Sequence, residues 1–334
     1  MKRIAILGGG SWGTALAIVL SRSRRAHEIC LWVREPEIVE SILDSRENKT
    51  FLPGYKLPET VSVTPDLSKS LRNAAVIVGA IPSAYARSVY TSALPHIAPE
   101  AVFVSATKGL EPDTHLRMSE IIAQVVSAKF SPRIAVLSGP SFAAEAAAGQ
   151  PTAVALASQD IALANELQDE FAGPSFRLYT NEDVLGVELA AAMKNVIAIA
   201  AGACQGLGLG SNPLAALITR GLAEMTRLAV ALGARPETLS GLAGLGDLVL
   251  TCTGALSRNR HVGMELGRGR SLTEILSGMK MVAEGVGTAA ALLALAREHQ
   301  VELPITQQVD AILHQGKPAR EAIRDIMERP LKRE

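Results

Sequence analysis

Runs of consecutive apolar residues recur through the first half of the chain, with helix-like stretches between them. Short continuous runs bounded by turn residues are typical of strands that a parallel sheet buries on both faces. Stretches such as residues 142–148 and 161–171 instead repeat their apolar positions with the helical period. The predicted strands comprise residues 4–7, 29–33, 61–63, 74–81, 101–105, 134–137, 152–157 and 176–179. This alternation predicts an α/β domain with a parallel sheet.

Beyond residue 181 the pattern changes, and only helical periodicity follows. Cap residues and first-turn acids precede a long helix, and a capping box begins at Ser271. Further helices are predicted at residues 258–266, 288–299, 304–315 and 318–329, with a loop at 282–285. At 334 residues the chain exceeds the size at which single cores stop growing. We therefore predict an α/β domain over residues 1–186 and an all-helical domain over residues 187–334.

One charged side chain, Lys194, stands alone among the apolar residues 189–219. On a helix it projects from a stripe of Val, Ile and Ala side chains, the face that normally packs inward. An unpaired buried ammonium is costly, so Lys194 requires a carboxylate or an anionic ligand, or else a lowered pKa. One interpretation is a lysine at a domain edge that extends its ammonium into solvent. The other is a lysine beside a substrate that serves as acid, base or phosphate ligand.

A glycine-rich turn follows the first predicted strand and precedes a helix. It contains the pattern G-x-G-x-x-G at Gly8, Gly10 and Gly13. Glycine at these positions permits a tight turn, the close approach of a pyrophosphate, and close packing of the helix on the strand. The N-terminus of the helix also attracts an anion. Together with its flanking strands and helix, the motif predicts a Rossmann-like dinucleotide site.

The second predicted strand ends near Arg34, where dinucleotide enzymes select between their cofactors. An acidic residue here binds ribose hydroxyls and favours NAD, whereas an Arg suits the 2′-phosphate of NADP. Glu35 and Glu37 lie close enough to leave both cofactors open, and a solvated strand end is the alternative for Arg34. We expect NADP(H), or the use of both NADP(H) and NAD(H). Residues 50–65, rich in Pro and Gly, predict a loop.

Polar residues follow two further predicted strands. Lys108 comes after the strand at residues 101–105, and Ser141 comes after the strand at residues 134–137. Ligands of open parallel sheets lie outside the carboxyl ends of the strands, so Lys108 stands where an anion is expected. A solvent-facing loop lysine is the alternative. Ser141 predicts an N-cap for the following helix, a structural role that needs no ligand.

The helical half contains one glycine-interrupted segment, residues 239–260, with a single acid. Asp247 lies there among Leu, Val and Ala, and a lone carboxylate in apolar surroundings requires a partner. Lys194 would be a fitting one. Another helix then begins, where Arg258 offers a fork of donors suited to phosphate. An exposed basic helix cap is the alternative for Arg258.

Composition and charge narrow the class of partner and the compartment. Lys plus Arg equals Asp plus Glu at 33 each, so the net charge suggests neither a nucleic acid nor an anionic membrane as a partner. The chain start lacks a signal region, and no apolar run approaches the roughly 18 residues of a membrane helix. Cys30, Cys204 and Cys252 match no metal or disulfide pattern and predict buried, reduced thiols. We expect a cytoplasmic protein without a metal site or an integral membrane segment.

Across nearly its whole length the sequence resembles the bacterial-type NAD(P)-dependent glycerol-3-phosphate dehydrogenases. The motifs that carry the resemblance occur in both halves of the chain, and their order is more specific than a glycine loop alone. They are residues 8–13 with 15–17, residues 106–110, 138–143, 194–198, 243–248 and 257–260. The resemblance implies a Rossmann-like N-terminal domain and a helical C-terminal domain like that of 6-phosphogluconate dehydrogenase. Cofactor choice does not transfer, because Arg34 lies where family members vary.

The resemblance also implies roles for particular residues. Lys194 would be the proton donor and acceptor at the reacting carbon, with Asp247 and Asn195 holding or tuning it. Substrate contacts are implied for Lys108, Gly139, Ser141, Lys194, Asp247, Ser257, Arg258 and Asn259. Cofactor contacts are implied for Gly8, Gly10, Ser11, Trp12, Gly13, Arg34, Lys108, Ala143, Arg258, Val282 and Glu284. The implied reaction interconverts sn-glycerol 3-phosphate and dihydroxyacetone phosphate and supplies phospholipid synthesis.

Two other functions are compatible with the sequence. A dehydrogenase of the same two-domain plan could act on a hydroxy acid, with its cation placed for a carboxylate. A module that senses NADPH without turnover would need neither Lys194 nor Asp247, so this pair argues against it. The oligomeric state is left open, with a homodimer as one option.

Overall fold

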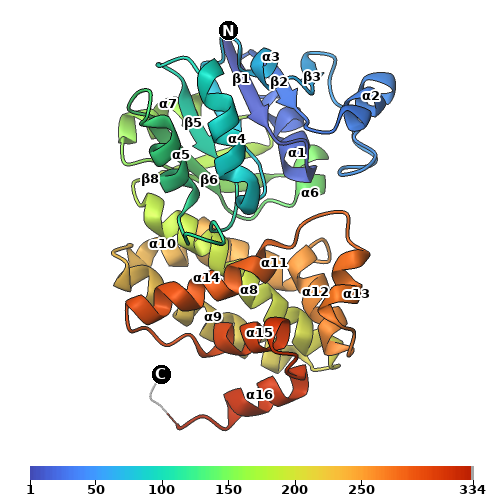
Figure 1. The fold of residues 1–334 in the computed structure, drawn as a ribbon, viewed down its shortest axis with the longest axis vertical. Helices are drawn as coiled ribbons and strands as arrows, with labels where there is room; N and C mark the ends of the chain where they lie inside the picture. The colour runs from blue at the N-terminus through green and yellow to red at the C-terminus, as the bar shows by residue number, and fades with distance from the viewer. Residues whose placement is uncertain (332–334) are drawn as a thin grey trace. The chain divides into compact units, whose positions relative to one another are not determined.

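The computed structural model describes residues 1–331 and forms two compact units (Figure 1). The first unit comprises residues 1–108 and 116–188. The second comprises residues 109–115 and the chain from Leu189 onward. Helix α8 (Val184–Gly206) therefore begins in the first unit and continues into the second.

The first unit is built on one 8-stranded sheet with the order β3-β2-β1-β4-β5-β6-β7-β8. Its strands are β1 (Lys2–Leu7), β2 (His27–Trp32), β3 (Val61–Thr64), β4 (Val76–Gly79), β5 (Val102–Ser105), β6 (Arg133–Ser138), β7 (Thr152–Ala157) and β8 (Phe176–Asn181). All predicted strands are present and differ only in their end residues. Every pair is parallel except β6 with β7, which is antiparallel and departs from the predicted parallel sheet. The strand order reverses between β1 and β4, the switch point at which open α/β sheets bind ligands.

Helices cover both faces of this sheet. Side chains alternate along β1, so Ile4 and Ile6 join one buried apolar cluster while Ala5 and Leu7 join the other. The first cluster includes residues of α1 (Ser11–Leu20), α2 (Pro36–Ser45), α6 (Ala143–Ala147) and α7 (Ile161–Phe171). The second includes residues of α3 (Leu67–Leu71), α4 (Ala86–Ala93) and α5 (Met118–Val126), and 3₁₀ turns lie at Ser83–Tyr85 and Leu94–His96. These three layers form the predicted Rossmann-like α/β fold.

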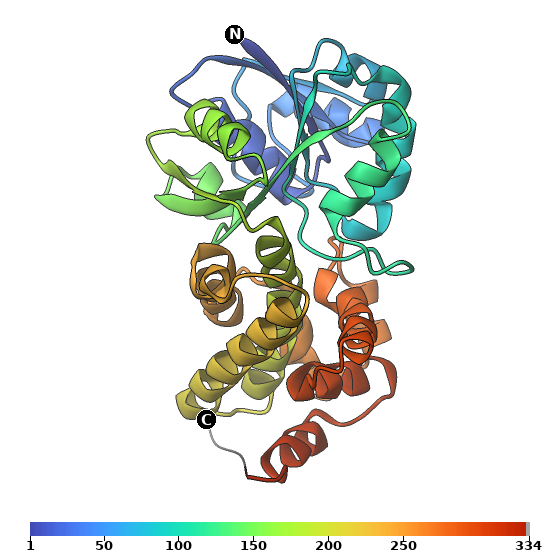
Figure 2. The same cartoon turned by 90° about the vertical axis from the view of Figure 1, so that its left-hand side faces the viewer.

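The second unit is helical, and residues 182–331 contain no strand, as the sequence predicts (Figure 2). Its elements are α8, α9 (Ser211–Ala231), α10 (Pro236–Ser240), a π-helical turn (Leu242–Gly246), α11 (Asp247–Thr253), α12 (Arg258–Gly267), α13 (Leu272–Ser277), α14 (Glu284–Glu298), α15 (Pro304–His314) and α16 (Ala319–Met327). The capping box is confirmed, because Ser271 Oγ accepts from Glu274 N at 3.3 Å and Glu274 Oε2 accepts from Ser271 N at 3.0 Å. The predicted loop at 282–285 is only partly right, since α14 already begins at Glu284.

The prediction that no apolar run approaches the length of a membrane span is wrong for helix α8. Among residues 1–331 it is the one helix long and apolar enough to cross a membrane, with a mean hydropathy of 1.7. However, 89% of its most apolar window is buried inside the protein. A core helix of a globular domain has the same composition, so the helix by itself is weak evidence for a membrane span.

Glycines allow α8 and α12 to pack with their backbones in contact. A Cβ atom added at Gly202 would lie 1.9 Å from Arg260 O, and one added at Gly263 would lie 1.9 Å from Ile199 O. Both distances are far below van der Waals contact, so only glycine fits at these positions. These close contacts lie in the C-terminal half of α8, and further toward its start Asn195, the residue after Lys194, accepts from Asn259 in the first turn of α12.

Candidate functional site

The glycine-rich loop between β1 and α1 has the steric demands that its sequence predicts. Gly8 has a φ of +120°, and a Cβ atom there would lie 2.5 Å from Ala80 O. A Cβ atom at Gly13 would lie 1.9 Å from Gly8 O, so glycine lets α1 approach the turn. Gly10 differs, because a Cβ atom there would meet nothing within 4 Å. Glycine at position 10 therefore borders a space that residues 1–331 do not fill.

The residues around this space fit a dinucleotide. Gly10 is the N-cap of α1 and provides no side-chain cap, so the first-turn amides of the helix, from Ser11 onward, are suited to an anion. The indole Nε1 of Trp12 is buried and has no hydrogen-bond partner among the described residues. A buried donor without a partner is uncommon in a folded protein and is consistent with a ligand at this position. These observations support a phosphate-bearing cofactor at the start of α1.

Arg34 lies just after β2 and is held by its neighbours. Its Nε and Nη2 atoms donate to Glu35 Oε1 at 3.0 and 2.8 Å, and its guanidinium lies 5.6 Å from the ring centroid of Tyr85. The side chain is 63% exposed. Arg34 is thus neither buried nor fully solvated, and its guanidinium is oriented by a carboxylate and an aromatic face.

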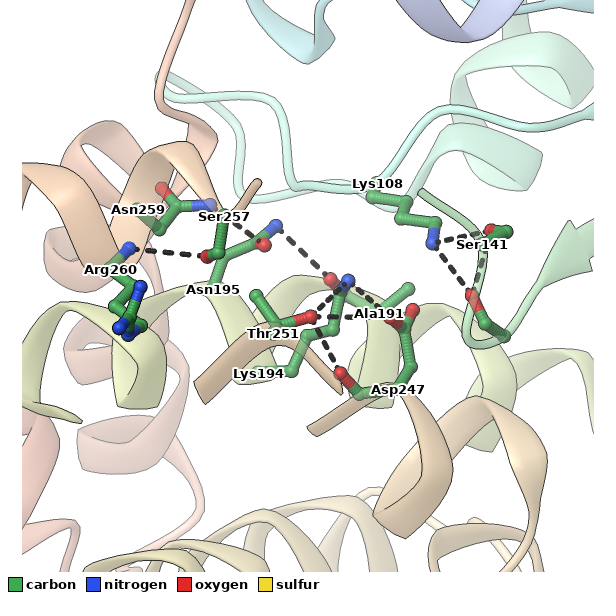
Figure 3. Close-up of polar contacts among 11 residues, drawn as sticks. Lys108, Ser141, Ala191, Lys194, Asn195, Asp247, Thr251, Ser257, Asn259 and Arg260 are labelled. Carbon is green, nitrogen blue, oxygen red and sulfur yellow. Dashed lines mark hydrogen bonds and ion pairs between the residues drawn. The ribbon is translucent and has the colours of Figure 1, made fainter. Parts of the chain in front are cut away.

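Lys108, Gly139 and Ser141 come together at the carboxyl ends of β5 and β6 (Figure 3). Lys108 Nζ donates to Gly139 O at 3.0 Å and lies 3.4 Å from Ser141 Oγ, which itself donates to Gly139 O at 2.9 Å. The predicted N-cap role of Ser141 is wrong, because the N-cap of α6 is Phe142 and no side chain caps the helix. The Ser141 hydroxyl turns back to its own loop instead. Ala143, a predicted cofactor contact, is the first residue of α6.

The Lys194 side chain is buried in the helical unit rather than extended into solvent (Figure 3). Its Nζ donates to Asp247 Oδ1 at 2.7 Å and to Thr251 Oγ1 at 2.9 Å. All three residues are at most 5% exposed. The predicted pairing of Lys194 with Asp247 is therefore present, and the interpretation as a solvent-seeking lysine is wrong.

Thr251 is the member of this group that sequence reasoning missed. Its hydroxyl donates to Asp247 O at 2.6 Å, which leaves a lone pair to accept from Lys194. A buried ion pair is tolerated only when further hydrogen bonds satisfy its atoms, and Thr251 supplies one. The signal was available, because Thr251 lies four residues after Asp247 and thus on the same face of a helix.

Burial also changes the pKa of the Cys252 thiol, which neighbours the Lys194–Asp247 pair. Burial raises the pKa of Cys252 to about 12, while the positive charge of Lys194 opposes the rise. The thiol is therefore protonated and unreactive at neutral pH. Cys30, Cys204 and Cys252 are all buried and unbonded, as the sequence predicts. Within residues 1–331 no cluster of three or more His, Cys, Asp or Glu could hold a metal ion.

A chain of buried amides links three helices of the same unit. Asn259 Nδ2 donates to Asn195 Oδ1 at 2.9 Å, and Asn259 Oδ1 accepts from Gly285 N at 3.0 Å. Asn195 Nδ2 in turn donates to Ala191 O at 3.3 Å. Both atoms of the Asn259 amide are used in holding α8, α12 and α14 together. The second Nδ2 hydrogen of Asn259 and its first-turn backbone amide remain as donors for a ligand.

Ser257 and Arg258 begin α12. Ser257 Oγ accepts from Arg260 N at 3.2 Å and is buried, as expected for an N-cap. The Arg258 side chain projects to an exposed position, yet partial desolvation lowers its pKa and the nearby Glu284 carboxylate opposes that effect. Glu284 is the first residue of α14, and Val282 precedes it with 47% of its surface exposed. The predicted residues of this region thus lie at two helix N-termini.

Comparisons with known proteins agree along the whole chain. Residues 3–164 match the family model for the N-terminus of NAD-dependent glycerol-3-phosphate dehydrogenase, and residues 183–324 match the model for its C-terminus. The glycerol-3-phosphate dehydrogenase [NAD(P)+] of Koribacter versatilis is 58% identical over 331 residues, which cover 99% of this chain and 98% of that protein. The protein of the same name from Geobacter sp. (strain M21) is 53% identical and covers 100% of this chain and 99% of its own.

A solved structure supports the same assignment. The crystal structure of glycerol-3-phosphate dehydrogenase from Coxiella burnetii is similar with a TM-score of 0.92 and 43% sequence identity. The match covers 98% of this chain and 99% of that one. The predicted family resemblance is confirmed, and the chain belongs to the NAD-dependent glycerol-3-phosphate dehydrogenase family.

Proposed function

We propose that this protein is an NAD(P)-dependent oxidoreductase that interconverts sn-glycerol 3-phosphate and dihydroxyacetone phosphate. Its relatives at 50–58% identity carry this enzyme name over their full lengths. The single observation that carries the proposal is the buried Lys194–Asp247 pair, with 2.7 Å between Nζ and Oδ1. A protein that only binds a cofactor does not require a buried ammonium. Burial of the pair costs desolvation free energy, and charged groups in such environments are common at catalytic sites.

The reduction of a ketone requires a hydride at carbon and a proton at the developing alkoxide. The nicotinamide, when bound, supplies the hydride. Lys194 Nζ stabilises negative charge on the carbonyl oxygen and donates the proton, and in the reverse direction it accepts the proton of the alcohol. Asp247 and Thr251 hold Nζ in one position by the bonds of 2.7 and 2.9 Å. General acid catalysis of this kind is typically worth ~10²–10⁴-fold.

The proposed division of labour follows the two halves of the chain. Residues 1–186 would supply most contacts to the dinucleotide and some to the substrate. Residues 187–334 would supply the catalytic groups and the remaining contacts to substrate and cofactor. Catalysis is assigned to Lys194, Asp247 and Asn195, and we add Thr251 as a residue that positions Lys194 and Asp247. Substrate contacts are assigned to Lys108, Gly139, Ser141, Ser257, Arg258 and Asn259. Cofactor contacts are assigned to Gly8, Gly10, Ser11, Trp12, Gly13, Arg34, Lys108, Ala143, Arg258, Val282 and Glu284.

The substrate phosphate is proposed to bind at the start of α12. Arg258 offers a guanidinium there, and the backbone amides of Arg258 and Asn259 lie at the start of the helix, whereas Ser257 Oγ already accepts from the Arg260 amide. The Arg258 side chain is exposed, so an anion can reach its guanidinium. The Asn259 side chain is held by Asn195 and Gly285, so its second Nδ2 hydrogen and its backbone amide are the groups assigned to the phosphate.

Three further proposals rest on the family resemblance. The cofactor is NADP(H) or NAD(H), and Arg34 would interact with the 2′-phosphate of NADP(H). The enzyme would act in the cytoplasm, where its product supplies phospholipid synthesis. The protein would form a homodimer, and sedimentation velocity of the purified chain tests this oligomeric state.

Loss of nicotinamide absorbance, with dihydroxyacetone phosphate as the only substrate, tests the function. We expect turnover with dihydroxyacetone phosphate and a much poorer rate with unphosphorylated dihydroxyacetone. A faster rate with a 2-keto acid would support a hydroxy-acid dehydrogenase instead. Tight binding of NADPH without turnover of any of these substrates would support a sensing module and overturn the proposal.

A further inference from the structure

Asn48 lies in the loop that follows α2 and has no assigned role, yet its side chain is completely buried against the glycine-rich turn. Asn48 Nδ2 donates to Gly9 O at 2.8 Å and to Thr14 Oγ1 at 2.9 Å. Asn48 Oδ1 accepts from Phe51 N at 3.1 Å. Both amide hydrogens and the amide oxygen therefore have partners, and the orientation of the amide follows from them, since Gly9 O requires a donor and Phe51 N an acceptor.

The bond to Gly9 O determines the direction of the next amide. In a trans peptide the C=O and the following N–H point in opposite directions. Asn48 holds the Gly9 carbonyl inward, so the Gly10 N–H points away from Asn48. The space beside Gly10 is open to 4 Å, in contrast to Gly9, where a Cβ atom would lie 2.5 Å from Val33 Cγ2. The Gly10 N–H is therefore directed away from the buried side of the loop.

A peptide between two glycines does not keep such an orientation by itself. Gly9 and Gly10 lack Cβ atoms, so both peptide orientations are accessible to them at little cost. An inward N–H would face the Asn48 amide hydrogens, and the outward C=O would repel an anion. Two buried donors face the Gly9 carbonyl, the Asn48 amide at 2.8 Å and the Thr14 hydroxyl at 3.4 Å. The shorter bond, from Asn48, is the main determinant of whether this position of the loop attracts or repels a phosphate.

The loop that carries Asn48 is fixed independently of the glycine turn. Leu52 and Leu57 are 3% and 2% exposed and belong to the same apolar cluster as α1. Leu57 N donates to Arg46 O at 2.7 Å, and the Arg46 guanidinium donates to Val61 O at 2.8 Å. Asn48 is therefore presented on an ordered support, which is what preorganisation of a binding loop requires.

We infer that Asn48 is a positioning residue for cofactor binding: it fixes the Gly9–Gly10 peptide so that its N–H faces the pyrophosphate. This inference rests on the proposed binding of a dinucleotide. Asn48 does not contact the cofactor itself, and it influences cofactor affinity through Gly9. The effect should therefore depend on whether the ligand contains a pyrophosphate.

The test compares the wild-type chain with Asn48→Asp, an isosteric change that keeps an acceptor for Phe51 N but removes both donors. Dissociation constants are measured by fluorescence titration for NADH, for ADP-ribose and for adenosine, which lacks phosphate. We expect NADH and ADP-ribose to bind about 10-fold more weakly, the order of effect of one lost buried hydrogen bond, and adenosine to bind as before. Equal losses for all three ligands would indicate a general structural defect and overturn the inference.

The pH provides a second readout that a structural defect would not change. A buried carboxyl has a raised pKa, and in its neutral form it can donate to Gly9 O. The affinity of the Asn48→Asp variant for NADH should therefore recover as the pH falls from about 8 to about 5.5, relative to the wild type. An affinity ratio that stays constant with pH would contradict the proposed hydrogen bond.

Two further variants complete the experiment. Asn212→Asp adds the same charge at an exposed position of α9 and should leave all three dissociation constants unchanged. Thr14→Val removes the second acceptor of Asn48 and the longer bond from Thr14 Oγ1 to Gly9 O at 3.4 Å, but it leaves the Asn48 donor to Gly9 O in place. It should weaken NADH by a smaller factor, which tests the inference even if Asn48→Asp does not fold. If the wild-type chain bound neither NADH nor NADPH, the proposed function would fail. If it bound them and both variants bound equally well, only the inference about Asn48 would fail.

Discussion

The two units of this protein each contain a buried polar centre, and the two centres differ in charge. In the first unit the neutral amide of Asn48 contacts Gly9 and Thr14. In the second unit the charged Lys194 contacts Asp247 and Thr251. Burying a hydrogen-bonded neutral amide costs little desolvation free energy, and such a group can only orient other groups. Burying an ion pair costs much more, but its ammonium can transfer a proton. The difference supports the proposed roles, binding for the first centre and chemistry for the second.

The largest effect is expected at Lys194, and it distinguishes the proposed catalytic role from the proposed binding role. Lys194→Met should lower kcat by at least ~10²-fold, because the alkoxide loses its proton donor. The dissociation constant for NADPH should change little, the opposite of the pattern expected at Asn48. Steady-state kinetics and fluorescence titration of the same preparation measure both quantities. A variant that keeps most of its turnover would remove Lys194 from the chemistry.

Another buried polar group, Glu224, sharpens the comparison because it is a carboxylate held by uncharged donors. Glu224 of α9 is 2% exposed and accepts from Ile305 N at 2.5 Å and from Thr306 N at 3.2 Å. Burial raises the pKa of Glu224 to about 7, although these N–H donors oppose the rise. Its role is proposed to be structural, joining α9 to the start of α15.

The sign of its pH dependence follows from the direction of that shift. The folded chain binds more protons at Glu224 than the unfolded chain between pH 4.5, the ordinary value, and about 7. Its contribution to stability is therefore full below that window and declines as the pH rises through it, by on the order of 1–3 kcal/mol. Thermal unfolding across the window should show a steeper decline for the wild type than for Glu224→Gln. Parallel curves would show that Glu224 does not titrate there.

Arg258 tests whether the second unit also recognises the substrate. Arg258→Ala should cost about 1.5–3 kcal/mol in kcat/KM for dihydroxyacetone phosphate, the range for a charged hydrogen bond. Binding energy from a remote phosphate also orients the carbonyl, so kcat should fall as well as KM rise. The rate with unphosphorylated dihydroxyacetone at saturating NADPH serves as the control. The same factor lost with both substrates would move phosphate recognition to Lys108 or Ser141.

Arg34 gives the smallest expected effect, confined to the first unit. Arg34→Ala should weaken NADPH more than NADH by about 1 kcal/mol, because the side chain is 63% exposed and already shared with Glu35. Dissociation constants for the two cofactors measure this difference, and kcat at saturating NADH should not change. Equal losses for both cofactors would exclude Arg34 from cofactor selection.

The sequence predicted the strands well because continuous apolar runs between turns have few alternative structures. It predicted the Lys194–Asp247 pair because each charge stood alone in an apolar stretch, and two such residues in one helical unit need one another. It missed Asn48, which donates to a residue 39 positions away and lies in a segment that predicted no more than a loop. The Ser141 cap failed because a hydroxyl has several acceptors within reach, and only the folded loop decides between them.

A double-mutant cycle on kcat tests most directly the claim that Lys194 and Asp247 act as one proton-transferring unit. Asp247→Leu alone should lower kcat strongly, because it leaves the Lys194 ammonium buried without its carboxylate. Combined with Lys194→Met, the same change should cost little more than Lys194→Met alone, since groups that act as a unit show non-additive losses. NADPH titration confirms that each variant still binds its cofactor. If the two losses in kcat multiplied, the residues would act independently, and the account of the helical unit would be contradicted.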